Sequence, residues 1–453
     1  MRADEGRLDV HQLRREIEDG RVDTVLLGFC DMQGRLQGKR LDAEYFLADV
    51  LDGPLHGSVE GCNYLLAVDV EMNTVGGYAM SSWERGYGDF VLRADLATLH
   101  RVPWHEGTVG LLCDLEWQDG TPVVASPRQI LRGQLDRVAD RGWQAFAGTE
   151  LEFIVFRDTY EDAWRRGYRD LTPASQYNVD YSMLGTARIE PLLRRIRNSM
   201  TGAGLTVESA KGECNLGQHE IAFKYDDVLR TCDQHTIYKN GAKEIAAQEG
   251  MALTFMSKFD AREGNSCHIH LSLRGLDGSA VFADDERLFR QFLAGLLTHL
   301  RELTLLLAPN VNSYKRFAEG SFAPTAIAWG RDNRTCALRV VGHGAGLRVE
   351  NRVPGGDVNP YLASAAMLAA GLAGIEGEYE LEPELVGNAY ASDAPRVPST
   401  LRPAREAFAG SALARRAFGD GVVDHYLHAA DTELVAFEAA VTDWERFRGF
   451  ERL

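Results

Sequence analysis

The sequence predicts an α+β protein with two domains. The N-terminal domain (residues 1–120) is small and β-rich. In the larger C-terminal domain (residues 121–453), antiparallel strands are expected to form a funnel with helices outside it. A length of 453 residues is enough for two or more domains. The pattern changes at Ser126-Pro127, an N-cap and first-turn pair that begins a helix. Before this point strand-like runs alternate with turns, and after it long helical patterns alternate with short strands.

The N-terminal part begins with a short helix over residues 7–20. DTVLLGF, the turn CDMQG and RLQGKRL then predict a strand, a glycine-containing turn and a second strand. CNYLLAVDVEM (62–72) and VGLLCDL (109–115) are two further strand candidates. These elements together predict a small sheet.

The C-terminal part is expected to start with a helix that ends near Arg141, followed by a strand pair in GWQAFAGTELEFIVF. Residues 158–180 show no regular period and are predicted to be a long loop. Helical patterns cover 187–205, 228–250, 286–308 and most of 359–453. LTFMSKF and HIHLSL are predicted strands, and 309–360 is predicted to hold loops and short strands.

Composition limits the classes of function. A net charge of −17 and a pI of about 5.2 argue against nucleic acid as the main partner. The seven cysteines are scattered and contain no CxxC, so neither a disulfide framework nor a zinc ribbon is expected. The first residues lack a signal sequence, and the apolar run 361–375 is too short to span a membrane. A soluble cytoplasmic enzyme is therefore expected.

Three pairs of reactive side chains stand two residues apart in strand-like runs. They are Glu150 and Glu152 in GTELEF, His268 and His270 in HIHLSL, and Glu350 and Arg352 in RVENRV. Side chains at i and i+2 on a strand point to the same face. Clustered carboxylates repel one another unless cations lie among them, so these pairs indicate a metal-bearing cavity.

Each motif has a simpler alternative when taken alone. A Glu-x-Glu pair is common on a solvated strand face, and Glu208, Glu213 and Glu220 could belong to a charged hairpin. A His-x-His pair also arises by chance on an isolated strand. The loop before the histidines, Glu263-Gly264-Asn-Ser, could bring its backbone close to a ligand.

Six arginines gather within residues 316–352 of this acidic chain: Arg316, Arg331, Arg334, Arg339, Arg348 and Arg352. Guanidinium groups bind carboxylates and phosphates in a bidentate way, although salt bridges within the chain are the alternative. The sequence has no GxxxxGK[ST] loop, so any nucleotide phosphates must be held by arginines and metal ions. Unaided, the residues indicate metal-assisted phosphoryl transfer.

Six motifs occur in the order GTELEF, GQHEIAF, HIHLSL, NSYKRF, RDNRTCALRV and RVENRVPGGDVNPYLA. Together they resemble the glutamine synthetase family, class I type, strongly over about 120–375 and loosely over 20–120. The chain is most similar to the glutamine synthetase-like γ-glutamylamide ligases of actinobacteria, which use polyamines or ethanolamine. The resemblance implies an ATP-dependent ligase that joins the γ-carboxyl of L-glutamate to an amine through a γ-glutamyl phosphate.

The resemblance also implies a β-grasp N-terminal domain, active sites between neighbouring subunits, and a dodecamer of two hexameric rings. It implies at least two Mg²⁺ or Mn²⁺ ions per site beside ATP. One set of metal ligands would be Glu152, Glu213 and Glu220, and the other Glu150, His268 and Glu350.

Further roles follow by the same matching of motifs. The residues implied to contact ATP are Glu208, Tyr225, His270, Ser272, Arg334 and Arg339. Arg316, Arg352 and the Gly264 backbone would hold glutamate. Arg316, Arg334 and Glu220 are the expected catalytic residues.

The chain departs from the family where the ammonium site would lie. Phe322 stands at the position of a flap glutamate, and His56 at that of an aspartate in the N-terminal domain. Ala345 replaces a nucleotide-contacting lysine, and Glu263 replaces an asparagine of the glutamate loop. Loss of two anionic groups weakens an ammonium pocket, and Phe322 offers apolar surface to a carbon chain. An organic amine (a polyamine such as putrescine, spermidine or spermine, or ethanolamine) is therefore the expected acceptor, with His56 and Phe322 at its site.

Other readings remain. The chain could be an ordinary glutamine synthetase that uses ammonium, with Phe322 a neutral substitution. It could be a non-catalytic member of the fold, although all six metal-ligand positions are retained. A metal-dependent amidohydrolase would need further histidines and a parallel barrel. Tyr390 is the nearest candidate for the family's adenylylated tyrosine, but its surroundings differ, so no such control is expected.

Overall fold

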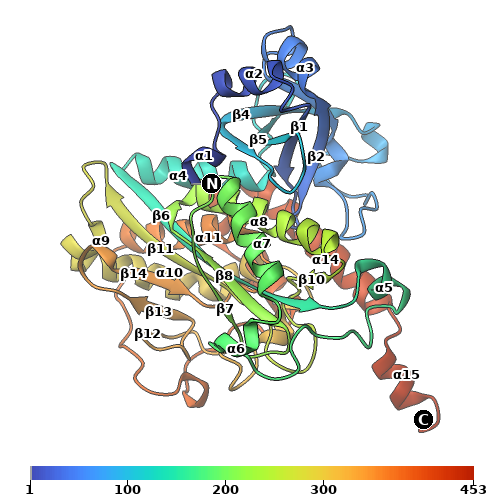
Figure 1. Cartoon of the computed structure of the whole chain (residues 1–453). Helices are drawn as coiled ribbons and strands as arrows, with labels where there is room; N and C mark the ends of the chain where they lie inside the picture. The colour runs from blue at the N-terminus through green and yellow to red at the C-terminus, as the bar shows by residue number, and fades with distance from the viewer. Residues whose placement is uncertain (1–2) are drawn as a thin grey trace.

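The computed structural model describes residues 3–453 and contains two sheets that lie one above the other, with most helices around the second (Figure 1). The first sheet consists of β1 (Thr24–Cys30), β2 (Leu36–Asp42), β3 (Ser58–Cys62), β4 (Asp89–Arg101) and β5 (Thr108–Glu116). Its order is β2-β1-β5-β4-β3, and β1 and β5 are its parallel pair. The short helices α1 (Ala3–Gly6), α2 (Val10–Glu18) and α3 (Ala43–Tyr45) accompany it.

Sequence and structure differ at three places in this sheet, one of which is that β3 was not predicted. Residues 62–72 are not a strand: a 3₁₀ turn over Asn63–Leu66 buries Asn63 and Leu66 three residues apart, which is a helical spacing. The long strand β4 was not predicted. Its residues include several polar side chains and its pairing with β5 shifts between Asp95 and His100, so the alternation that marks a strand is interrupted.

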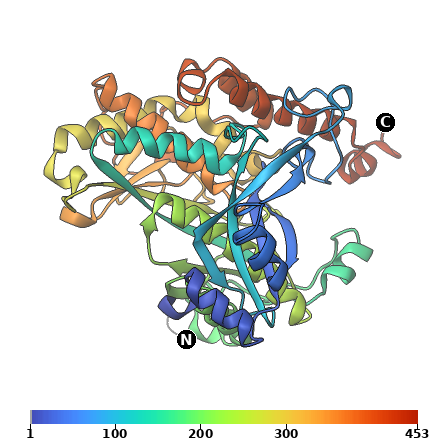
Figure 2. The same ribbon diagram turned by 90° about the horizontal axis from the view of Figure 1, so that it is seen from above.

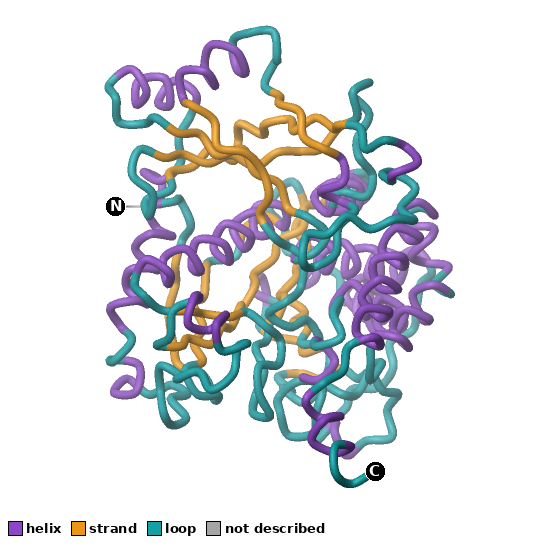
Figure 3. Tube along the Cα trace, turned by 90° about the vertical axis from the view of Figure 1, so that its right-hand side faces the viewer, coloured by secondary structure: helices purple, strands orange, loops and turns teal. Residues whose placement is uncertain are grey.

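The second sheet has nine strands, and its strands lie among helices and loops (Figure 3). Seven of them follow the order β12-β13-β14-β11-β6-β8-β7, with β9 and β10 paired to β6. They are β6 (Trp143–Phe156), β7 (Val207–Gly212), β8 (Gln218–Phe223), β9 (Asp226–Asp227), β10 (Ala252–Thr254), β11 (Cys267–Gly275), β12 (Trp329–Arg331), β13 (Leu338–Val341) and β14 (Arg348–Asn351). The expected strand pair at 142–156 is wrong, because β6 is one continuous strand at the centre of the sheet.

Helices surround this sheet (Figure 2) and confirm the predicted α+β class. The long ones are α4 (Pro127–Ala139), α7 (Glu190–Gly202), α8 (Val228–Gln248), α10 (Glu286–Leu307), α11 (Pro360–Glu376) and α14 (Asp420–Ala439). The shorter ones are α5 (Tyr160–Arg165), α6 (Met183–Thr186), α9 (Val281–Asp284), α12 (Leu401–Ala409), α13 (Ala412–Phe418) and α15 (Asp443–Gly449). Within residues 3–453, no helix is both long enough and apolar enough to cross a membrane.

The core depends on close packing of α10 against α11. A Cβ at Gly295 would lie 2.1 Å from the Ala370 carbonyl oxygen, and one at Gly374 would lie 2.1 Å from the Gln291 carbonyl oxygen. Only glycine allows these two backbones to approach so closely. The apolar run 361–375 is thus a buried helix, as its sequence predicts.

A buried arginine ties the first sheet to the helices. Arg128, at the start of α4, donates to Asp114 of β5 at 2.6 Å and to Asp95 of β4 at 2.8 Å. It also donates two hydrogen bonds to Asp233 of α8, at 3.0 and 2.9 Å. Its side chain is 3% exposed, so a single desolvated guanidinium satisfies three carboxylates from three elements.

Replacing Arg128 tests this junction. Arg128→Ala leaves Asp233 buried and without its cation, and we expect a loss of about 3–5 kcal/mol in unfolding free energy. Urea or thermal unfolding measures it. The matched control is Arg132→Ala, since Arg132 contacts the same Asp95 and Asp114 but is 34% exposed, so its loss should stay below about 1 kcal/mol. Equal losses for the two variants would contradict the buried-junction account.

Candidate active site

The register of four central strands brings the predicted metal-ligand side chains together. Glu150 of β6 is directly opposite His268 of β11, and Glu152 is opposite Glu220 of β8. His270 is opposite Glu350 of β14. Since the pairs Glu150/Glu152 and His268/His270 are each two residues apart, they share one face of the sheet. The spacing of these residues in the sequence therefore predicted their common face.

The first cluster contains Glu152, Glu213 and Glu220, each of which offers a carboxylate oxygen within 4.8 Å of the others. Burial, followed by repulsion from Glu213, raises the pKa of Glu152 to about 8. Burial and repulsion from Glu150 raise the pKa of Glu220 well above its usual value. The backbone N–H of Ser266 donates to Glu152 at 2.7 Å and fixes its orientation. Such a cluster could hold a divalent cation, which would remove the repulsion.

A lysine that sequence reasoning missed lies among these carboxylates. Lys211 on β7 is opposite Glu220 in the ladder, and its ammonium contacts Glu213 and lies 4.9 Å from the centre of the Tyr181 ring. Burial opposes its charge, but Glu220 and Glu213 outweigh burial and raise its pKa. One sequence pattern could have indicated this role: Lys211 stands two residues before Glu213, in the glutamate-containing segment 207–223.

The second cluster contains Glu150, His268 and Glu350. His268 Nδ1 lies 3.1 Å from Glu150 and 3.4 Å from Glu350. Burial, followed by the Arg352 charge, lowers the pKa of His268 to about 4, so its ring is neutral at pH 7 and a nitrogen lone pair is available. Burial opposes ionisation of Glu350 as well, but His268 and Arg352 outweigh it and lower the pKa.

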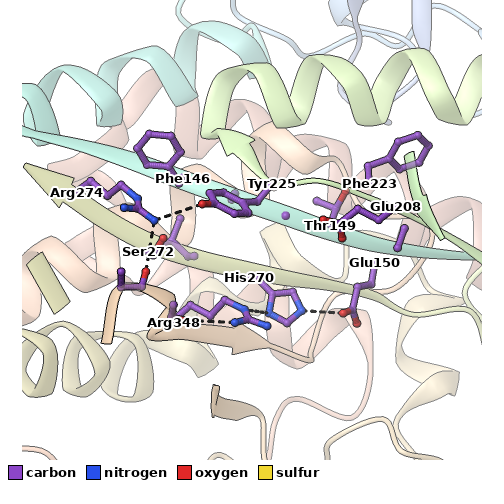
Figure 4. A pocket seen from close by; sticks show the side chains of 16 residues that line it. Phe146, Thr149, Glu150, Glu208, Phe223, Tyr225, His270, Ser272, Arg274 and Arg348 are labelled. Carbon is purple, nitrogen blue, oxygen red and sulfur yellow. Dashed lines mark hydrogen bonds and ion pairs between the residues drawn. The ribbon is translucent and has the colours of Figure 1, made fainter. Parts of the chain in front are cut away.

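Two cavities meet at Glu150. One, of about 310 Å³, is lined by both clusters together with Gly264, Phe322, Arg334, Arg339 and Arg352. The other, of about 280 Å³, is lined by Glu208, Tyr225, His270, Ser272 and Ala345 (Figure 4). The residues predicted to contact ATP thus divide between the two, with Arg334 and Arg339 on the cluster side. We call these the cluster cavity and the aromatic cavity.

The aromatic cavity has Phe146, Tyr225 and Arg274 on one side and His270 with Arg348 on the other (Figure 4). Phe146 and Tyr225 lie with ring centres 6.2 Å apart, and the Arg274 guanidinium is 5.7 Å from the Phe146 ring. Arg348 Nε donates to His270 Nδ1 at 3.1 Å, so the ring proton is on Nε2, which donates to Glu150 at 3.0 Å. Phe146 and Arg274 were not singled out from the sequence, since nothing local distinguishes them.

Arg316 lies behind the wall of the cluster cavity. It is 1% exposed, lines neither cavity, and donates to the backbone carbonyls of Arg352, Val353 and Pro354. Burial lowers its pKa to about 10. A buried guanidinium needs several acceptors, and here they come from the segment that follows β14. Arg316 therefore supports Arg352, which does line the cluster cavity.

The remaining predicted residues are placed as follows. A Cβ at Gly264 would lie 2.1 Å from the Ser257 carbonyl oxygen, so only glycine fits this loop. His56 lines a separate hollow on the first sheet with Lys39, Tyr45 and Trp117. Within a single chain, this hollow contains none of the residues of the two clusters. Tyr390 is partly buried and donates to the Ala323 carbonyl oxygen at 2.9 Å.

Comparison with known proteins identifies the class of this site. A family model described as the catalytic domain of glutamine synthetase matches residues 124–448. An ADP complex of GmaS superimposes with a TM-score of 0.84 at 26% identity, covering 97% of this chain and 99% of that one. The chain therefore belongs to the glutamine synthetase family, and it is an ATP-dependent ligase of the glutamate–amine class.

Two curated relatives are similar over nearly their full length. The chain is 66% identical over 449 residues to a gamma-glutamylethanolamide synthetase of Streptomyces coelicolor, covering 98% of this chain and 96% of the relative. It is 37% identical over 458 residues to a glutamate–isopropylamine ligase of a Pseudomonas species, covering 98% and 99%. The predicted family resemblance is thus confirmed.

The raised pKa of Glu152 predicts a pH effect in protein stripped of divalent cations. Its folded pKa of about 8 exceeds the ordinary 4.5, so between these values the folded state holds a proton that the unfolded chain has lost. Raising the pH therefore favours unfolding. Above about pH 6.5, where histidines no longer contribute, we expect Glu152→Gln to gain about 1–2 kcal/mol over wild type by pH 8. Chemical unfolding at pH 6.5 and 8 measures this, and a constant difference would contradict it.

Proposed function

We propose that this ligase joins the γ-carboxyl of L-glutamate to ethanolamine, using ATP and passing through a γ-glutamyl phosphate. The observation that carries the proposal is that an all-carboxylate cluster, a carboxylate–imidazole cluster and two cavities meet at Glu150. The 66% identity to a gamma-glutamylethanolamide synthetase supports ethanolamine as the amine. A polyamine is the second candidate, and ammonium the third.

The donor sets fit Mg²⁺ or Mn²⁺. Every donor is a carboxylate oxygen or an imidazole nitrogen, which suits these hard or borderline cations. Glu152, Glu213 and Glu220 would hold one ion, and Glu150, His268 and Glu350 the other. When bound, the ions neutralise phosphate charge and help to orient ATP.

ATP is proposed to lie across both cavities. The aromatic cavity would take the nucleoside, with Tyr225 and Phe146 offering rings, and Glu208 and Ser272 polar contacts. His270, Arg334 and Arg339 would face the phosphates on the way to the cluster cavity. Arg339 already lies 2.8 Å from Glu350, which places a guanidinium beside the second cluster.

The reaction needs two steps because a carboxylate is a poor electrophile. A γ-carboxylate oxygen of glutamate attacks the γ-phosphorus of ATP, and ADP leaves. An acceptor that arrives as an ammonium ion first gives one proton to solvent; its nitrogen then attacks the acyl carbon, phosphate leaves, and the nitrogen gives a second proton to solvent. Arg334 and Arg352 are proposed to stabilise the charge on the phosphoryl and carboxylate groups, and Gly264 lets the glutamate loop pack closely. Arg316 positions Arg352, and Glu220 acts in the first metal site.

The position of Phe322 favours an organic amine over ammonium. Phe322 is 54% exposed in the cluster cavity and has φ of 57°, an unusual backbone conformation for a bulky residue. Its exposed ring provides apolar surface that suits methylene groups and does nothing for NH₄⁺. A dodecamer of two hexameric rings in the cytoplasm is also proposed, in which His56 of each chain approaches a neighbour's cluster cavity.

The substrate assignment is tested by phosphate release with glutamate, ATP and Mg²⁺, with the product mass checked. We expect ethanolamine to give a kcat/KM at least about tenfold above those for putrescine, spermine and ammonium, because binding differs by about 1.4 kcal/mol or more. Preference for ammonium would make the chain an ordinary glutamine synthetase.

The metal assignment is tested with Glu220→Gln, which keeps the side-chain shape but removes a charge from the first cluster. We expect kcat to fall by about 100-fold or more, and Mn²⁺ binding followed by electron paramagnetic resonance to lose one site. Glu376→Gln is the control, since Glu376 bonds Arg137 and Arg141 at the end of α11, away from both cavities. Unchanged Mn²⁺ stoichiometry would exclude Glu220 as a ligand.

A further inference from the structure

One carboxylate of the cluster cavity belongs to neither proposed metal set and lies beside aromatic rings. Apart from the six clustered ligands, the described lining contains two acidic side chains, Asp180 and Glu263. Glu263 adjoins Gly264 in the loop assigned to glutamate. Asp180 comes from a different segment, which precedes α6, and it lines the same cavity as Phe322. Asp180 is therefore free to serve another ligand.

The geometry of this segment presents Asp180 and its neighbour to the cavity. Asp180 N–H donates to Asn178 Oδ1 at 2.8 Å, which closes a local turn, and Tyr181 has φ of 53°. Cys214 Sγ lies 3.6 Å from Asp180 Oδ2 and donates to it. Tyr181 is 73% exposed, so its ring surface is open to a ligand. Both aromatic residues of this cavity, Tyr181 and Phe322, thus have left-handed backbone conformations, which are costly and cluster at functional sites.

A primary ammonium group of the protein itself lies against this wall. The Lys211 ammonium lies 4.9 Å from the centre of the Tyr181 ring and contacts the carboxylate of Glu213. Asp180, Glu213 and Cys214 also each offer an atom within 4.8 Å of one another. An alkylammonium ion has the same headgroup as lysine, so a ring and a carboxylate here form a suitable environment for one.

We propose that Asp180 is a specificity-determining residue that binds the protonated nitrogen of the acceptor amine, while Tyr181 and Phe322 contact its carbon chain. This inference rests on the proposed function and names the amine subsite of the same cavity. Phe322 stands where the family has an anionic glutamate. The carboxylate of Asp180 would supply the missing negative charge from a different segment of the cavity wall. A short alkylammonium ion matches this combination, whereas NH₄⁺ has no carbons to pack against the rings.

The test uses the full-length enzyme with saturating ATP, glutamate and Mg²⁺, and compares wild type with Asp180→Asn. We expect the KM for ethanolamine to rise by about tenfold, since a hydrogen bond to a charged group is lost, while the KM values for glutamate and ATP change less than about twofold. Hydroxylamine is the matched probe, because it is a nitrogen nucleophile that is neutral at pH 7. Turnover with hydroxylamine should change little, and Asp180→Glu should restore part of the ethanolamine affinity.

The outcomes separate this inference from the proposed function. If wild type forms no γ-glutamyl amide with any amine, the proposed function fails. If wild type uses ethanolamine and Asp180→Asn has the same KM for it, only the Asp180 assignment fails. Loss of a Mn²⁺ site in Asp180→Asn, measured by electron paramagnetic resonance, would overturn the inference by making Asp180 a metal ligand. Glu263→Gln gives the contrast, because its effect should fall on the KM for glutamate.

Discussion

Repulsion among buried carboxylates is the constraint on which this structure depends. The five glutamates of the two clusters, Glu150, Glu152, Glu213, Glu220 and Glu350, line one cavity together with Glu263. Cationic side chains neutralise part of the negative charge of these glutamates. Lys211 contacts the first cluster, and Arg339 and Arg352 contact the second. The two clusters respond differently, because Glu152 and Glu220 have raised pKa values whereas Glu350 has a lowered one. Repulsion among the carboxylates is therefore less fully compensated in the first cluster, and a bound cation would relieve more of it there.

The central sheet makes this arrangement rigid. Five of the six ligand side chains belong to strands that pair with neighbours on both sides, so the backbone ladder sets their separation, and Glu213 directly follows β7. Arg316 adds a second layer of support by joining three consecutive carbonyls after β14. Its place behind the cavity wall shows that a residue matched to a binding motif can act by holding another residue in position.

The two cavities divide recognition between rigid and adaptable parts. Five of the six cluster ligands and the His270–Arg348 contact are on strands, whereas Asp180, Tyr181 and Phe322 are on irregular segments. Loops tolerate sequence change more readily than central strands. Relatives that share the strand residues can therefore differ in the amine they accept, as the names of the ethanolamide and isopropylamine ligases illustrate.

The sequence by itself determined the α+β class, the strands at 24–30 and 267–275, the helices at 127–139 and 360–376, and the shared face of Glu150 with Glu152 and of His268 with His270. These depend on local periods, which a single chain segment carries. Only the tertiary structure decided which residues from distant segments meet. The pairing of Glu152 with Glu220, the contact of Lys211 with the first cluster and the presence of Asp180 and Phe322 in one cavity all depend on strand register and loop paths. No local pattern encodes them, because they result from packing between segments that are far apart in the chain.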